Sequence, residues 1–476
     1  MHLYSALAVV LVAVKSSLAG FSDQVTNFDL GPVFAFRHGC NITCQLLLEV
    51  TNRLDLEFVG KFFDEGFYAT APEFTSSSPG DILKIESFDA SNLEIPTSIK
   101  TYRFQYTSID VNGSLAPSTG FLALPAPNSY DTRSKLKLIA WAHGTTGLHC
   151  GCVPSSARKL WGYDSWGPLS DQGYAVVGTD YVGLGNNYTS HKYLSLAAHA
   201  NDIYYSVMAV RKAFPDLFTV KWLSIGHSQG GGTVAIAPAV NALDLATTPY
   251  DKILPLPISD DYFAKAETPL LLMGIQAAFP SYGMPWAARA LKERIQYASA
   301  AQSCLFATAG LTLDLTDEQL VVAGGAHPKD DDTLKEWTRQ QAAAQGALSS
   351  MPILVIQGLS DTAILPECTR RAYENATRFS RIRLQEYPGV GHFEIVSAST
   401  PAWLEFVRDR FSGYPTSFES SRHVVDLDDP TLAGTSIDMS GISAQRMPCA
   451  RDCYLRNFFG KMRSDTACVG EWCSPA

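Results

Sequence analysis

The chain has 476 residues, of which 46% are hydrophobic and 18% are charged, a composition that supplies a large buried core and excludes a disordered protein. The formal net charge is −10, and no block of lysine and arginine occurs in the sequence. These charges exclude nucleic acid as a partner and argue against binding to an anionic membrane surface.

The N-terminus has the pattern of a secretory signal peptide. Residues 6–14 are apolar, and the small residues that follow suit cleavage after Ala19. The apolar run is too short to cross a bilayer as a helix. The sequence therefore predicts a signal peptide over residues 1–19 and a secreted, extracellular protein without a stable membrane span. A weak N-terminal anchor is the alternative, because Lys15 follows the run and no lysine or arginine precedes it.

The cysteines and asparagines fit an extracellular protein. The ten cysteines are an even number and all follow residue 19, which favours disulfide bonds. Spacing does not give their pairing, and zinc half-sites at Cys150-Gly-Cys152 and at Cys449 with Cys453 are the alternative. Four Asn-X-Ser/Thr sequons predict a glycoprotein, and they lie at Asn41, Asn112, Asn187 and Asn375.

Short apolar runs predict a sheet wrapped by helices. Residues 100–124 alternate between apolar and polar side chains on both sides of an Asn112-Gly113 turn, which is typical of an antiparallel hairpin. Three apolar runs that each end at loop residues follow, with a helical pattern at about residues 195–214 between the second and the third. Strand, helix and strand in this order favour a parallel sheet and an α/β fold. The three runs lie at residues 136–141, 174–178 and 221–225.

The rest of the chain is expected to interrupt and then resume this core. A further strand is predicted at residues 352–357, and the interval before it, which includes a helix near residues 333–347, is interpreted as an insertion above the sheet. Extra helices within the core are the alternative. The predicted parts are a first core part at 20–240, a cap or lid at 241–350, a second core part at 351–412, and a cysteine-rich extension at 413–476.

One motif carries the chemistry. Gly226-His227-Ser228-Gln229-Gly230 follows an apolar strand pattern and precedes a helix of small residues, which is the setting of a nucleophile elbow. Glycines on both sides remove side chains where the turn is sharpest, and the turn exposes the serine hydroxyl for attack. An ordinary glycine-rich turn between a strand and a helix is the alternative.

A nucleophilic serine needs a base and an acid, which follow it in the order acid, then histidine, in α/β-hydrolases. Asp361 lies just past the strand predicted at 352–357, and His392 lies in a glycine-flanked loop past another strand pattern. Both positions face the carboxyl edge of a parallel sheet. We therefore expect Ser228, Asp361 and His392 to act together. The rival acids are Asp180, Glu367 and Glu394, and the rival bases are His227 and His423.

The sequence also suggests donors for a developing oxyanion. The backbone amide of Gln229, directly after the serine, is the first candidate. The second is the amide of Thr145 or Thr146, in the loop HGTTG that follows the run at 136–141. A simple glycine turn in this loop is the alternative.

These motifs resemble the fungal secretory lipase family of α/β-hydrolases, the lipase A-like group. The likeness spans about residues 95–410 and rests on AWAHGTTG, LSDQGYAVVGTDYVGLG, GHSQGG, PILVIQGLSDTAILP and YPGVGHF. The resemblance implies an α/β-hydrolase fold with a mostly parallel central sheet, flanking helices, and a helical cap inserted after the nucleophile strand. It also implies a serine carboxylester hydrolase whose catalytic triad is Ser228, Asp361 and His392, with no metal ion or organic cofactor.

The predicted function is a secreted esterase or lipase that cleaves a small-molecule or lipid ester through an acyl-enzyme. Resemblance to the trichothecene esterase branch implies an acetylated secondary metabolite as substrate, with triacylglycerol as an alternative. A serine aminopeptidase would need a carboxylate such as Asp260, Asp261 or Glu267 for the substrate ammonium. A non-catalytic binding protein on a hydrolase scaffold is a further alternative. The apolar stretch 269–286 is expected to be buried cap core rather than a lid that faces lipid.

Overall fold

The computed structural model describes residues 25–60, 63–88, 93–236, 262–322, 328–341, 349, 351–414 and 419–426. The predicted signal peptide, Asp260, Asp261 and the four C-terminal cysteines lie outside the described residues. The chain divides into two compact units, Met1–His423 and Val424–Ala476, and nearly all described residues belong to the first.

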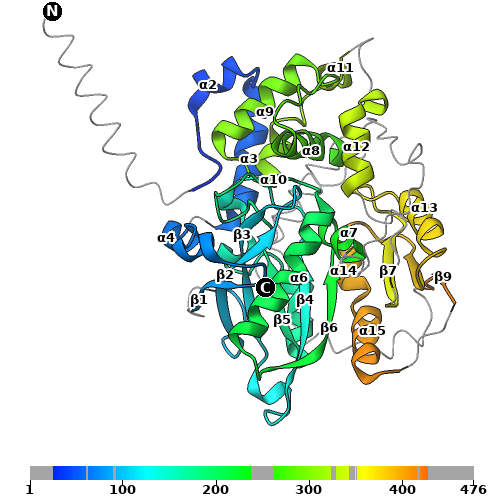
Figure 1. Cartoon of the computed structure of the whole chain (residues 1–476). Helices are drawn as coiled ribbons and strands as arrows, with labels where there is room; N and C mark the ends of the chain where they lie inside the picture. The colour runs from blue at the N-terminus through cyan, green and yellow to red at the C-terminus, as the bar shows by residue number, and fades with distance from the viewer. Residues whose placement is uncertain are drawn as a thin grey trace, which may run out of the picture. The chain divides into compact units, whose positions relative to one another are not determined.

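A six-stranded sheet forms the larger part of the core (Figure 1). Its strands run in the order β1-β2-β3-β5-β4-β6. The predicted hairpin at residues 100–124 is confirmed as β2 and β3, which pair antiparallel from Lys100 opposite Leu124 to Ile109 opposite Leu115. Gly113 in its turn has a φ of 80°, a conformation that glycine adopts without steric cost. The strand bounds are β1 Ile82–Ser87, β2 Lys100–Ile109, β3 Leu115–Leu124, β4 Leu136–Ala142, β5 Ala175–Thr179 and β6 Phe218–Gly226.

The three predicted apolar runs form the parallel part of this sheet, whereas β1, β2 and β3 pair antiparallel with their neighbours, so the sheet is mixed rather than mostly parallel as the resemblance implied. β4 pairs parallel with β5 and with β6, and the last residue of β4, Ala142, lies opposite both Thr179 and Gly226. All three strands therefore end at one edge of the sheet. The residues that directly follow these ends are His143, Asp180 and His227.

A second sheet lies toward the C-terminal end of the described residues. Its strand order is β7-β8-β9, with bounds Ile353–Gly358, Ile382–Tyr387 and Ser421–Val424. β7 and β8 pair parallel and end together, with Gly358 opposite Tyr387. The predicted strand at 352–357 is β7.

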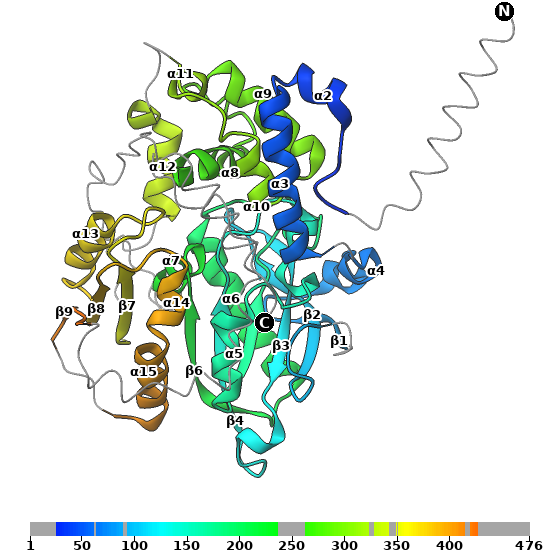
Figure 2. The same ribbon diagram turned by 180° about the vertical axis from the view of Figure 1, so that it is seen from behind.

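Helices cover both faces of the six-stranded sheet (Figures 1 and 2). Side chains alternate between the faces of a strand, so neighbouring residues of β4 enter different clusters. Leu138 packs in a cluster with residues of α6 (Leu196–Ala213), and Ile139 packs in a cluster with residues of α5 (Tyr163–Asp171) and α15 (Thr400–Ser412). The other helices of this part are α4 Glu65–Tyr68, α7 Gln229–Ile236, α13 Pro366–Ala376 and α14 Glu394–Ala398.

A helical cap lies above the carboxyl edge of the strands in Figure 1. It includes five helices from the predicted insertion and two from the N-terminal region, α2 and α3. The sequence assigned α2 and α3 to the first core part, but Ala35 and Cys44 share an apolar cluster with cap residues such as Trp286 and Leu291. The bounds are α2 Gly31–Arg37, α3 Ile42–Val59, α8 Tyr262–Ala278, α9 Arg289–Ala301, α10 Leu305–Gly310, α11 Asp317–Leu320 and α12 Asp332–Gln341.

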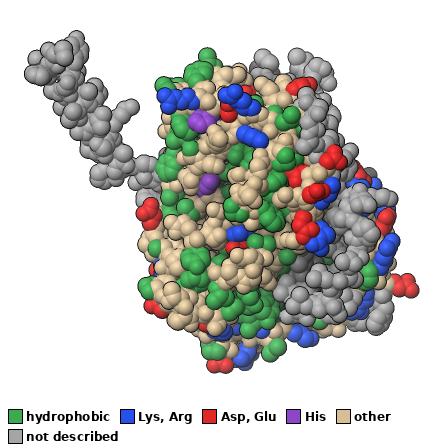
Figure 3. Space-filling view, turned by 45° about the horizontal axis from the view of Figure 1, so that its top comes forward, with side chains coloured by type: hydrophobic (Ala, Val, Ile, Leu, Met, Phe, Trp, Pro, Cys, Tyr) green, Lys and Arg blue, Asp and Glu red, His purple; other side chains and the backbone are tan. Residues whose placement is uncertain are grey.

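The apolar stretch 269–286 belongs to the interior of the cap. Leu270, Leu272, Ile275 and Trp286 are fully buried. The expectation of a cap core rather than a lipid-facing lid therefore agrees with the structure. Apolar side chains on the face in Figure 3 are interspersed with polar atoms. No helix in the described ranges has both the length and the hydropathy needed to span a bilayer.

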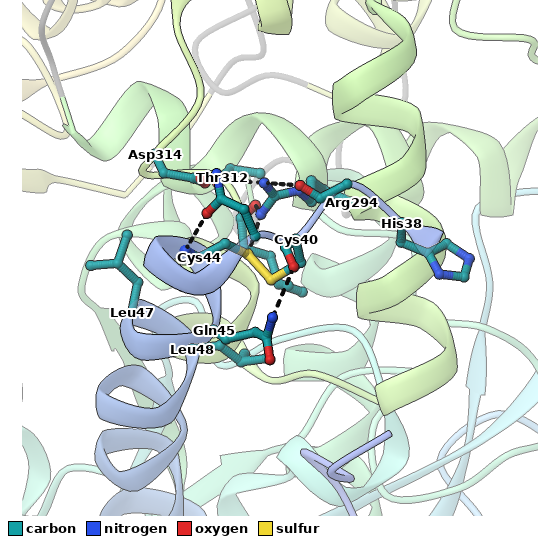
Figure 4. The surroundings of a disulfide bond; sticks show 12 residues. His38, Cys40, Cys44, Gln45, Leu47, Leu48, Arg294, Thr312 and Asp314 are labelled. Atoms are coloured by element: carbon teal, nitrogen blue, oxygen red, sulfur yellow. Dashed lines mark hydrogen bonds and ion pairs between the residues drawn. A yellow bond between two sulfur atoms is a disulfide. The ribbon is translucent and has the colours of Figure 1, made fainter. Parts of the chain in front are cut away.

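Two disulfides stabilise the cap and its junction with the core. Cys40 and Cys44 bridge the start of α3, and the Arg294 guanidinium of α9 contacts Cys44 Sγ and donates to the Gly39 carbonyl at 2.7 Å (Figure 4). Cys152, in the loop after β4, is bonded to Cys304 at the start of α10. The predicted disulfide bonding is confirmed for these four cysteines. Because Cys152 is oxidised, it is not available as a zinc ligand. Among the described cysteines, Cys150 and Cys368 are free thiols.

Candidate active site

Ser228 occupies a sterically demanding turn between β6 and α7. Its φ is 57°, in the left-handed region that residues other than glycine rarely adopt. A Cβ at Gly226 would lie 2.4 Å from the Gly230 carbonyl oxygen, and a Cβ at Gly230 would lie 2.0 Å from the carbonyl oxygen of Ala142 in β4. Both positions therefore require glycine, and the local structure has the strand, turn and helix that the motif predicts.

The structure brings Ser228, His392 and Asp361 together. His392 Nε2 lies 2.9 Å from Ser228 Oγ, and His392 Nδ1 lies 2.8 Å from Asp361 Oδ2. A carboxylate only accepts, so Nδ1 carries the proton and Nε2 presents its lone pair to the serine hydroxyl. The three side chains form one hydrogen-bonded chain from hydroxyl to carboxylate.

Two different sheets supply the three residues. Ser228 follows β6 of the six-stranded sheet, whereas Asp361 and His392 lie in the loops after β7 and β8. The chain of hydrogen bonds therefore joins two parts of the core that do not share a strand ladder.

Backbone amides hold the Asp361 carboxylate. Oδ1 accepts from the amides of Ala363 at 2.9 Å and Ile364 at 2.8 Å. Burial by itself raises the pKa of Asp361, but the hydrogen bond and charge of His392, together with these two amides, outweigh burial and leave the pKa below its ordinary value. The carboxyl group therefore stays ionised, ready to stabilise a positive charge on His392.

The rival residues occupy other places. Asp180 is fully buried and accepts from Ser155 and Thr119, and burial raises its pKa to about 6. Glu367 lies exposed in the first turn of α13, and Glu394 begins α14. His423 is an exposed residue of β9.

The candidate oxyanion loop lies beside the serine. A Cβ at Gly144 would be 3.3 Å from Ser228 Cβ, so the backbone that leads to Thr145 and Thr146 passes next to Ser228. The Thr145 hydroxyl is 2.8 Å from the hydroxyl of Tyr193. The Thr146 hydroxyl is buried without a hydrogen-bond partner among the described residues. Gln229 is the first residue of α7, and its backbone amide lies at the N-terminal end of that helix.

Solved structures of low sequence identity share this architecture. Candida antarctica lipase A in its closed state matches with a TM-score of 0.61 and 15% identity, over 76% of this chain and 89% of that chain. The chain has an α/β-hydrolase fold. The rice cell wall degrading esterase LipA from Xanthomonas oryzae matches this chain with a TM-score of 0.52 and 18% identity, over 70% of this chain and 98% of that chain. Comparison with family models and with curated proteins gives no match.

Beneath the Ser228 turn, the α/β-hydrolase core contains a stack of neutral rings that sequence reasoning missed. Ring centroids are 4.2 Å apart for His143 and Tyr181, 4.4 Å for Tyr181 and His199, and 5.1 Å for His199 and His191. Burial lowers the pKa of His143 to about 4 and that of His191 to about 3, and it holds that of His199 well below the ordinary value. The Gln229 side chain donates to His199 Nδ1 at 3.3 Å, so this stack anchors the residue that follows Ser228.

Sequence reasoning also missed the contact that His227 makes. The sequence offered His227 only as a rival base, whereas in the structure its Nε2 lies 2.7 Å from the backbone carbonyl oxygen of His392. The signal in the sequence was its position, adjacent to Ser228 in a turn that faces another loop. The partner could not be inferred because it is a backbone atom 165 residues away.

Proposed function

We propose that this protein is a secreted serine carboxylester hydrolase, an esterase or lipase, with Ser228, His392 and Asp361 as its catalytic triad. The observation that carries the proposal is the continuous hydrogen bonding from Ser228 Oγ through His392 to Asp361 on a strained strand-to-helix turn. The α/β-hydrolase fold adds support, because the neighbours named above are a lipase and an esterase.

The reaction has two halves. His392 Nε2 takes the Ser228 proton as Oγ attacks the ester carbonyl carbon, and Asp361 stabilises the resulting imidazolium. His392 then gives the proton to the departing alcohol, which leaves an acyl-enzyme. Water, deprotonated by His392, attacks the acyl carbon, and the proton returns to Ser228 as the acid departs. The backbone amides of Gln229 and of Thr145 or Thr146 stabilise the oxyanion in both halves.

The cap and the resemblance support one substrate class within this proposal. The interior position of residues 269–286 favours a cap over a lipid-facing lid, and hence an esterase before a triacylglycerol lipase. An acetylated secondary metabolite such as a trichothecene fits this esterase. Of the three carboxylates that an aminopeptidase could use, Glu267 of α8 is the one within the described residues. Its charge contributes, after burial, to the raised pKa of Tyr193, and this contact gives no specific support to a peptidase.

Secretion and glycosylation belong to the same proposal. Two disulfides fit an oxidising compartment. Asn41, Asn112 and Asn187 are exposed and accessible to a glycan, whereas Asn375 is half-buried within α13. The proposed domain organisation is a core in two parts, interrupted by a cap at 241–350 that α2 and α3 join.

The test is a Ser228→Ala variant on p-nitrophenyl esters from acetate to long acyl chains, with and without an emulsion. We expect a loss of kcat/KM of at least about 10³-fold, with the fold retained. Ser397→Ala, at an exposed serine of α14, is the matched control and should keep full activity. If Ser228→Ala retained most of the activity, the proposal would be wrong. Preference for short chains without emulsion supports the esterase, and a need for emulsion supports the lipase.

A further inference from the structure

The two halves of the candidate triad are held by different parts of the chain. Backbone bonds fix the loop of His392 to the β7 side, because the Ser360 amide donates to the Val390 carbonyl at 3.0 Å and the Leu359 amide donates to the Tyr387 carbonyl at 2.9 Å. These contacts hold His392 near Asp361, which lies in the loop after β7. They do not fix the distance from His392 to Ser228, which belongs to the other sheet.

A hydrogen bond from His227 connects the loop of His392 to the turn after β6. His227 precedes Ser228 directly, and its Nε2 lies 2.7 Å from the His392 carbonyl oxygen. The ring centroids of His227 and His392 are 4.8 Å apart, so the two side chains also pack against each other. The hydrogen bond therefore joins the backbone of His392, the proposed base, to the residue directly before Ser228, the proposed nucleophile.

We propose that His227 is a positioning residue that holds the loop of His392 at the distance from Ser228 needed for proton transfer. The inference rests on the proposed function, because it assigns to His227 the alignment of that triad. It gives His227 no contact with the reacting atoms.

The chemistry of the hydrogen bond from His227 to the His392 carbonyl suits a residue that holds a loop in place. A carbonyl oxygen only accepts, so Nε2 of His227 carries the proton and one tautomer is selected. Burial lowers the pKa of His227 to about 4, with a further contribution from the charge of His392. His227 therefore stays neutral while His392 becomes an imidazolium, and no second cation opposes the proton transfer.

Loss of this bond should affect the chemical step more than substrate binding. A shift of about 1 Å in a reacting group lowers the rate by up to about 10²-fold. His227 touches the base loop rather than a bound ester, so its removal should lower kcat and leave KM nearly unchanged.

The experiment compares His227→Leu with His227→Gln. Leucine keeps apolar volume but cannot donate, whereas the glutamine amide places a donor at nearly the distance of Nε2. We expect kcat to fall about 10- to 100-fold in H227L with KM within about 2-fold, and to recover to within about 3-fold of wild type in H227Q. His423→Leu, at an exposed histidine of β9, is the matched control and should be unchanged.

Hydrogen exchange of the peptide that covers residues 388–395 provides a readout independent of activity. We expect faster exchange there in H227L than in wild type or H227Q, with β7 unchanged. Equal kcat in H227L and wild type, equal losses in H227L and H227Q, or unchanged exchange in H227L would each overturn the inference. A wild-type protein with no esterase activity but this exchange pattern would overturn the proposed function and leave the role of His227 in holding the loop intact.

Discussion

The Ser228 turn and the helical cap obey different physical constraints. In the turn, a Cβ at Gly226 or Gly230 would meet backbone atoms at 2.4 Å or less, and backbone cannot move aside cheaply. In the cap, side chains such as Leu291 and Trp286 are buried against other side chains, where several apolar residues of suitable volume would serve. Close contact between backbone segments therefore allows only glycine at fixed positions, which gives a motif that can be recognised in the sequence. Side-chain packing in the cap requires only that the buried residues be apolar and of suitable volume.

The largest effect that this comparison predicts is for a methyl group added in the turn. Gly230→Ala places Cβ 2.0 Å from the Ala142 carbonyl oxygen, so β4, β6 or the Ser228 turn must shift. We expect loss of nearly all ester hydrolysis and a destabilisation of about 3 kcal/mol. Gly283→Ala in the cap, where no atom lies within 4 Å of the new Cβ, should change neither. Activity assays and thermal denaturation of both variants measure the contrast, and a fully active G230A would contradict it.

The second prediction separates a disulfide that joins core and cap from one within the cap. Cys152 and Cys304 are 152 residues apart, and Cys40 and Cys44 are four apart. Since loop-closure entropy grows with loop length, replacing both cysteines by serine should cost about 5 kcal/mol for the long loop and about 2 kcal/mol for the short one. Denaturant unfolding of the two double variants gives the comparison. A larger loss for the Cys40 and Cys44 pair would show that local packing around Arg294, not chain entropy, dominates.

The third and smallest prediction concerns pH. The unfolded chain binds protons on its histidines below about pH 6.5. In the folded chain, burial lowers the pKa of several histidines, to about 4 for His143 and His149, so their contribution to stability is lost as pH falls below 6.5. Buried carboxyls with raised pKa values act in the opposite direction and lose their contribution as pH rises. The histidines are His143, His149, His191, His199 and His227, and the carboxyls are Asp55, Asp180 and Asp202.

His149 allows the effect of a single histidine to be measured. Its Nε2 is buried without a hydrogen-bond partner among the described residues, and burial lowers its pKa to about 4. His149→Leu should therefore reduce the stability lost between pH 6.5 and pH 5 by roughly 2 kcal/mol, at about 1.4 kcal/mol per pH unit. Denaturant midpoints at the two pH values measure this difference. An equal acid-induced loss in variant and wild type would contradict the assignment of a neutral His149 with a buried Nε2.

The sequence predicted the strands and site residues that follow from local patterns along the chain. Period-two alternation predicted the β2 and β3 hairpin, and apolar runs that end at loop residues predicted β4, β5, β6 and β7 to within a few residues. Ser228, Asp361 and His392 could be singled out because each follows a predicted strand, and parallel strands end at one edge.

Contacts between distant segments could not be predicted. The packing of α2 and α3 into the cap depends on an apolar surface that only the folded insertion creates. The His227 bond ends on a backbone carbonyl, which has no signature in sequence. The bond between Gln229 and His199 likewise depends on how α6 and α7 meet. The division of the strands into two sheets depends on pairing, which apolar runs do not specify.

Covalent labelling by a fluorophosphonate tests the central claim most directly. The probe reacts with a serine whose hydroxyl has been activated by a neighbouring base. Peptide mapping of the labelled wild-type protein should place the modification on Ser228, and His392→Ala should reduce the labelling rate at least about 10³-fold while the protein remains folded. Labelling of another serine, or undiminished labelling of Ser228 without His392, would contradict the account.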